Sequence, residues 1–161
     1  MALTVDTLKT QDLGYLSGAD LLQWCPAQIL IKQYEVDNNS LVSGANYAYA
    51  EITSALINRY DIATELNKSN ADGDRVIFCV KLTAILAIRN ALGNMANVSE
   101  YMMEIFKGAK KDLMDIRNGQ LNLPLALPPQ QTFTDPDSGQ TFPVKTEATA
   151  RLIRSSFSTL G

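Results

Sequence analysis

The segment Y-A-E-I-T-S-A-L-I-N-R-Y, from Tyr49 to Tyr60, decides the fold class of this 161-residue chain. With the residues just before it, the segment repeats apolar side chains at spacings of three and four, the pattern of one helix face. Glu51 and Arg59 lie off this stripe. We therefore expect an amphipathic helix that ends near Asp61. The stripe comprises Ala45, Ala48, Tyr49, Ile52, Ala55, Leu56 and Tyr60.

A second helical pattern runs from about Asp74 to Leu92 and is apolar on nearly every side. A half-exposed surface position cannot accommodate such a helix, so it is expected at the centre of the fold or against another subunit. Asp72 or Asp74 is expected to cap its N-terminus, and Gly93 with the following asparagine to end it. Lys81 and Arg89 interrupt the stretch, so a soluble helix is favoured over a membrane span of about 20 apolar residues.

A third helical pattern begins near Asn97, where Glu100 three residues later forms a capping pair, and it is expected to end at Gly119. Its lysines and aspartates are expected to face water. Its apolar stripe comprises Met102, Ile105, Phe106, Ala109, Leu113 and Ile116. Three long helices joined by short links predict a small helical bundle.

The two ends of the chain differ from this central part. Ser17 is a suitable N-cap for one short helix, and Pro26 suits the first turn of another. Beyond Leu121 prolines exclude a continuous helix, and Asp-Pro-Asp-Ser-Gly at 135–139 predicts a turn between two strand-like pieces. We therefore predict an all-α fold: a leader at residues 1–15, a helical bundle domain at 16–121, and an extended C-terminal arm at 122–161 that contains a turn or small hairpin.

The composition excludes several classes of function. A formal net charge of −3 gives no general attraction for phosphate backbones. There is no histidine, which removes the commonest general base and most transition-metal sites. Phosphate-binding glycine loops and familiar serine-nucleophile motifs are also missing from the sequence. Cys25 and Cys79 form no C-x-x-C pair, so two buried thiols in a reducing compartment are favoured. The first ten residues do not look like a secretory signal.

A few residues could be read as sites. Asn70, Asp72 and Asp74 are spaced like the start of a calcium loop, but Arg75 and Lys81 occupy the places of the required glycine and glutamate, so helix capping is the better interpretation. Asp135 to Gly139 is interpreted as a plain turn.

Glu51 could act as a catalytic acid, but without a second acid on its helical face an ion pair or interface contact is favoured for it and for Arg59. Trp24 is expected to be a core aromatic, with a binding anchor as the alternative. We predict no catalytic, cofactor or metal residues.

The order of these elements resembles a family of small proteins from Mu-like prophages. Ala50 to Tyr60 resembles the family's A-x-E-I-[DT]-S-Y-L-x-x-R-Y helix, and residues 19–21 match an earlier A-D-L segment. Residues 86–92 loosely match its D-I-A-R-Y-R-L helix, and 117–124 resemble its K-G-x-x-x-L-x-L ending. The chain departs from the family at Ala55, where tyrosine is frequent, in the link before Asp74, and in the tail after Pro129.

This resemblance implies a head-to-tail connector, or head-completion protein, of tailed phages. Such proteins assemble as a ring, commonly of twelve subunits, beneath the portal protein, contact other head-completion or tail proteins, and let DNA pass without specific binding. The implied location is the virion, and the host cytoplasm during assembly, with no membrane contact. An apolar arm and an excess of apolar helix could supply the two different surfaces that a ring needs. The candidate oligomer or partner contacts are Glu51, Arg59, Phe133, Phe142, Leu152, Ile153 and Phe157.

Two rival hypotheses belong to other classes. One is a small helical binding or regulatory protein without catalytic activity, such as a tail-assembly chaperone. The other is an enzyme that relies on Glu51, Asp72 or Asp74. The genes adjacent to this one would discriminate the connector from the regulator.

Overall fold

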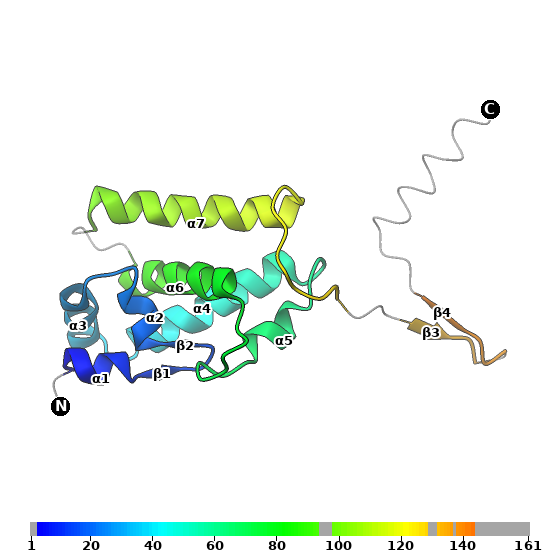
Figure 1. Cartoon of the computed structure of the whole chain (residues 1–161), viewed down its shortest axis with the longest axis horizontal. Coiled ribbons are helices and arrows are strands. Elements are labelled where there is room, and N and C mark those ends of the chain that lie inside the picture. The colour runs from blue at the N-terminus through cyan, green and yellow to red at the C-terminus, as the bar shows by residue number, and fades with distance from the viewer. Residues whose placement is uncertain (1–2, 94–97, 129–131, 137, 144–161) are drawn as a thin grey trace. The chain divides into compact units, whose positions relative to one another are not determined.

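The computed structural model describes residues 3–93, 98–128, 132–136 and 138–143 of the chain. The chain is mostly helical and belongs to the all-α class, as predicted. It divides into two compact units, Met1–Pro128 and Pro129–Gly161. The helices of the first unit are α1 (Val5–Lys9), α2 (Gly18–Leu22), α3 (Ala27–Val36), α4 (Ser40–Leu56), α5 (Ile62–Leu66), α6 (Ile77–Leu92) and α7 (Glu100–Asn118) (Figure 1).

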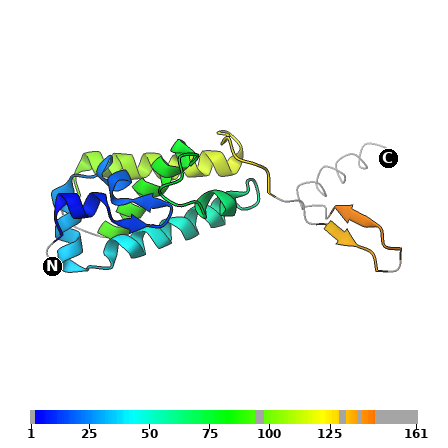
Figure 2. The same cartoon turned by 60° about the horizontal axis from the view of Figure 1, so that its bottom comes forward.

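Helix α6 lies at the centre of the first unit. It packs against α4, α2 and α7 (Figures 1 and 2), and ten of its residues are buried, as its all-round apolar sequence predicts. The contact with α4 is very close: a Cβ added to Gly44 would lie 2.5 Å from the carbonyl oxygen of Ala87. Alanine and glycine at this crossing therefore bring the two backbones together, and the crossing forms the middle of the core.

Helix α4 begins at Ser40, before the predicted stripe. Its first turns contain Ser43 and Gly44, which are poor helix formers, but the close contact with α6 holds them in the helix. The predicted buried positions Ala45, Ala48, Ile52 and Leu56 are confirmed.

The start of α6 differs from the prediction. Neither Asp72 nor Asp74 caps it, since Val76 is the N-cap residue and has no side-chain cap. Asp72 instead accepts a hydrogen bond from the Ser69 amide at 2.7 Å, and Asp74 pairs with Lys68 at 3.2 Å. The Asp72 and Asp74 side chains therefore order the preceding turn, and the prediction of their capping role was wrong.

The segment predicted to be a leader takes part in the core. Its strand β1 (Asp12–Leu13) pairs in antiparallel register with β2 (Leu16–Ser17), and Leu8, Leu13 and Tyr15 are buried. The Tyr49 hydroxyl donates a hydrogen bond to the Leu13 carbonyl and accepts one from the Leu16 amide at 3.3 Å. These bonds attach the hairpin to α4.

Residues after α7, up to Pro128, also belong to the first unit and pack against it. The Ala126 carbonyl accepts a hydrogen bond from the Asp61 amide at 2.9 Å, and the Leu123 amide donates to the Tyr60 hydroxyl at 3.1 Å. The compact unit therefore extends beyond residue 121 to Pro128.

The second unit contains the predicted hairpin. Strands β3 (Thr132–Thr134) and β4 (Thr141–Pro143) pair in antiparallel register, with Phe133 opposite Phe142. Gly139 supplies the positive φ of +66° in the connecting turn. The predicted contact residues Leu152, Ile153 and Phe157 lie outside the described residues.

Candidate partner-binding surface

Helix α7 has one face buried and two flanks next to hollows in the surface. Ser99 caps its N-terminus by accepting a hydrogen bond from the Met102 amide at 3.3 Å, in place of the predicted Asn97, which lies outside the described residues. Gly119 ends the helix at φ +82°, as predicted. The buried residues are Met102, Phe106, Ala109, Leu113 and Ile116, whereas Ile105, predicted on the same stripe, is half-buried.

One flank of α7 borders a hollow of about 310 Å³ against α4. A second hollow, of about 510 Å³, lies between the start of α7 and the end of α6. Both are lined by Lys110, so they adjoin, and we call the two together the charged groove. Its charged lining residues are Glu51, Arg89, Lys107, Lys110 and Arg117, and its apolar ones include Met103, Met114, Ala55 and Leu113.

Among the described residues that line the charged groove, Glu51 is the one carboxylate. Its Oε2 lies 3.8 Å from Arg89 Nη1, and its Oε1 lies 3.9 Å from Lys110 Nζ. These side chains are 30%, 36% and 48% exposed, so water screens both ion pairs and each stabilises the fold little. The surface is therefore cationic on a chain of net charge −3, although Glu104 pairs with Lys107 at 2.9 Å.

Arg59 lies at the end of the groove and joins two elements. Its guanidinium donates to the Arg117 carbonyl and to the Asn122 side chain, both at 3.4 Å. It also lies against the ring of Tyr60, 5.7 Å from the ring centroid. A Cβ added to Gly119 would lie 2.5 Å from Arg59 Nη1, so the glycine makes room for the guanidinium. Arg59 therefore holds the end of α7 near the end of α4.

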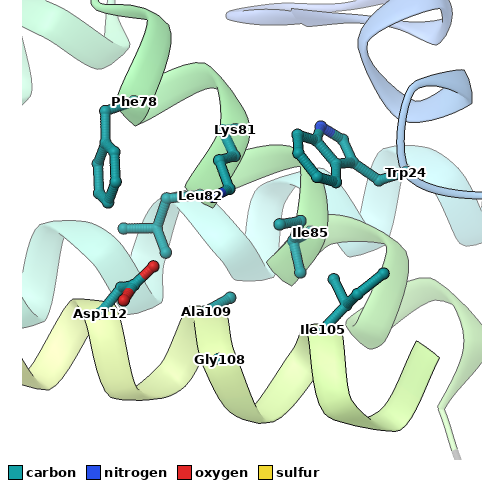
Figure 3. A pocket seen from close by; sticks show the side chains of 9 residues that line it. All are labelled: Trp24, Phe78, Lys81, Leu82, Ile85, Ile105, Gly108, Ala109 and Asp112. Carbon is teal, nitrogen blue, oxygen red and sulfur yellow. The ribbon is translucent and has the colours of Figure 1, made fainter. Parts of the chain in front are cut away.

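The opposite flank of α7 borders a hollow of about 170 Å³ that is mainly apolar. We call it the apolar hollow (Figure 3). Ile105 and Ala109 on α7 lie across from Leu82 and Ile85 on α6, and Trp24 forms one side. The remaining lining residues are Phe78, Lys81, Gly108 and Asp112.

Trp24, predicted as a core aromatic or a binding anchor, is half-buried on the wall of this hollow. Lys81 Nζ lies 5.4 Å from the centroid of its ring and 5.7 Å from that of Phe78. The cation lies over the aromatic rings, which holds its alkyl stem along the apolar wall.

A buried carboxylate, Glu65, was not predicted as a functional or structural residue. Its Oε1 accepts hydrogen bonds from the Tyr15 hydroxyl and the Val76 amide, both at 2.7 Å, and its Oε2 lies 2.7 Å from Lys68 Nζ. Burial opposes ionisation, but the bonds from Lys68, Tyr15 and Val76 outweigh it, so the pKa of Glu65 is lowered. The sequence carries one local signal, the spacing of Glu65 and Lys68 by three residues.

The two cysteines are free and buried, as predicted. Burial raises the pKa of each thiol to about 12. Both are therefore protonated at neutral pH and make poor nucleophiles.

The other candidate sites have ordinary structural partners. Asn70 donates a hydrogen bond to Asp12 at 2.6 Å, and Asp72 and Asp74 have partners in Ser69 and Lys68. Each suspected calcium residue therefore takes part in a structural contact. Within the described parts of the chain, no group of three or more aspartate, glutamate, cysteine or histidine side chains could hold a metal ion. Over those same ranges no helix is long and apolar enough to cross a membrane.

Of the predicted contact residues, the structure places Glu51 in the charged groove and Arg59 beside it. Phe133 and Phe142 are cross-strand partners in the second unit. Comparisons with protein-family models, curated proteins and solved structures find no match for this chain.

Proposed function

We propose that this chain is a structural protein that assembles through α7, and specifically a head-to-tail connector of a tailed phage or prophage. The observation that carries the proposal is the chemical difference between the two flanks of α7, one cationic and one apolar, each next to a hollow. A closed ring forms through a heterologous contact, so each subunit must present two different surfaces. The two flanks supply such a pair on one helix.

The resemblance to the prophage family is the reason for proposing a connector ring rather than another assembly. The first seven residues of the segment that resembles the family helix, Ala50 to Leu56, lie in α4, and Glu51 among them reaches the charged groove. In this proposal α4, α6 and α7 form a small bundle, which carries the ring contacts.

The second unit acts as an arm toward a neighbouring subunit or the portal protein. Its proposed contact residues are Phe133, Phe142, Leu152, Ile153 and Phe157. The net charge of −3 suits a channel that lets DNA pass without binding it. The protein acts in the virion without catalysis.

Co-expression with the portal protein from the same gene cluster tests this proposal. Size-exclusion chromatography with light scattering gives the mass of the complex, and negative-stain images give its shape. We expect rings of this chain bound to the portal. The free chain alone is not a sufficient test, since an adaptor can stay monomeric until it meets the portal. A chain that neither binds the portal nor forms a ring with it would contradict the proposal.

A small chaperone or regulatory protein is the second candidate. The observation that favours it is the length of the charged groove, which could hold one helix of a client protein. Portal and capsid genes next to this gene favour the connector, and regulatory neighbours favour this alternative.

A further inference from the structure

The charged groove is long enough to hold a helix of several turns. Its lining includes Met103 near the start of α7 and Arg117 near the end. These residues are 14 positions apart, which corresponds to about 21 Å along a helix axis, or about four turns. A helix lying beside α7 could therefore contact the whole groove.

The charges of the groove are poorly balanced. Arg89 and Lys110 share the Glu51 carboxylate at long distance, and Lys107 pairs with Glu104. Among the described residues no carboxylate lies within ion-pair distance of Arg117. Four cations of the groove therefore have two carboxylates within ion-pair distance among the described residues. Added carboxylates would meet cations that the fold neutralises only in part, and complementary charge of this kind favours association.

The groove also presents apolar side chains, which decide between two kinds of anionic partner. Met103 is 46% exposed and Met114 58% exposed. Ala55 on α4 and Leu113 on α7 line the same groove. Methionine adapts its shape to apolar partners. A phosphate backbone would gain little from these side chains, because cations supply essentially all of its non-specific affinity. An acidic helix with an apolar stripe would use both features of the groove.

We propose that the charged groove binds an acidic amphipathic helix of a partner protein, about four turns long. Its carboxylates lie toward Arg89, Lys107, Lys110 and Arg117, and its apolar stripe packs on Met103 and Met114. This inference rests on the proposed function in that a protein covers the charged flank of α7 in the assembly. It adds the chemical class of that partner and the surface that holds it.

A synthetic peptide of about 15 residues tests the inference, because that length makes a helix of about four turns. The probe carries leucine at helical three-four spacing with glutamate on both sides of the stripe. A matched peptide has glutamine in place of every glutamate, and a short DNA duplex represents the alternative ligand. Binding to the full chain is measured by fluorescence anisotropy at low and at high salt.

We expect the glutamate peptide to bind, and to bind about tenfold more weakly when Lys110→Glu or Arg117→Glu reverses one charge. Added salt should weaken binding. Lys32→Glu is the matched control: it makes the same charge change at an exposed position on α3 that does not line the groove, and it should leave the affinity unchanged. Far-UV circular dichroism checks that each variant is folded.

Four results would overturn the inference: no binding of the glutamate peptide, equal affinity for the glutamine peptide, no effect of either groove substitution, or displacement of the peptide by the DNA duplex. The outcome is separable from that of the ring experiment. A chain that forms rings on the portal but does not bind the glutamate peptide keeps its proposed function and loses this inference. A chain that binds the peptide through Lys110 but does not bind the portal keeps this inference and loses its proposed function.

Discussion

The α4–α6 crossing and the α6–α7 contact bury apolar stripes of similar pattern, but they pack in different ways. At the α4–α6 crossing the backbone of Gly44 approaches Ala87 so closely that no Cβ would fit. Helix α7 instead packs through large side chains such as Met102 and Phe106, and hollows lie on both of its flanks. An apolar stripe therefore predicts burial, whereas the size of its residues decides how closely two helices approach. We infer that the first contact holds the fold and that the second leaves surface for partners.

The largest loss of stability is expected at Glu65, whose side chain accepts a hydrogen bond from Val76, the N-cap residue of α6. Glu65→Ala removes the acceptor for the Tyr15 hydroxyl and the Val76 amide and should lower the free energy of unfolding by about 3 kcal/mol. Urea denaturation followed by circular dichroism measures it. Glu65→Gln, which keeps an acceptor oxygen, should cost clearly less. Equal losses for the two variants would show that these hydrogen bonds contribute little.

The α4–α6 crossing itself gives the next effect. Gly44→Ala places a Cβ 2.5 Å from the Ala87 carbonyl oxygen and 2.9 Å from the Ala91 Cβ, so the helices must separate. Overpacking of this kind costs about 3 kcal/mol, and the better helix propensity of alanine returns about 1, so we expect a net loss of about 2 kcal/mol. An unchanged urea midpoint would contradict the close crossing.

Acid should remove part of the stabilisation that Glu65 provides. Because the folded protein lowers the pKa of Glu65, its contribution is present above the unfolded value of about 4.3 and is lost as the pH falls through the folded pKa. The measurement is the difference in unfolding free energy between wild type and Glu65→Gln from pH 7 to pH 3. That difference should shrink below about pH 4.3. A constant difference would mean that ionised Glu65 adds no stability.

A glycine-to-alanine substitution in helix α7 should stabilise the fold, whereas Gly44→Ala in α4 destabilises it. No atom of the described residues lies within 4 Å of a Cβ added to Gly108, so Gly108→Ala gains helix propensity without a clash. We expect a stabilisation of about 1 kcal/mol in the same urea titration. A loss of stability would indicate that α7 packs as closely as α4 and would remove the contrast between the two contacts.

Local signals in the sequence predict α7 well and the other elements less completely. Gly119 and the apolar stripe of α7 act within the helix, so its end and its buried face could be predicted. The start of α4 could not, since Ser43 and Gly44 disfavour a helix locally and only the contact with α6 explains them. Glu65 was missed because its partner Tyr15 is 50 positions away in sequence. The two flanks of α7 were hidden for the same reason, since Trp24 comes from the turn after α2 and Glu51 comes from α4.

We propose that the flanks of α7 are covered by partners while the rest of the first unit supports α7. Lysine labelling with an amine-reactive reagent, read by mass spectrometry on the free chain and on the portal-bound assembly, tests it directly. We expect Lys110 in the charged groove and Lys81 beside the apolar hollow to lose reactivity on assembly, while Lys32 on α3 keeps it. Equal labelling of Lys110 and Lys81 in the two states would contradict it.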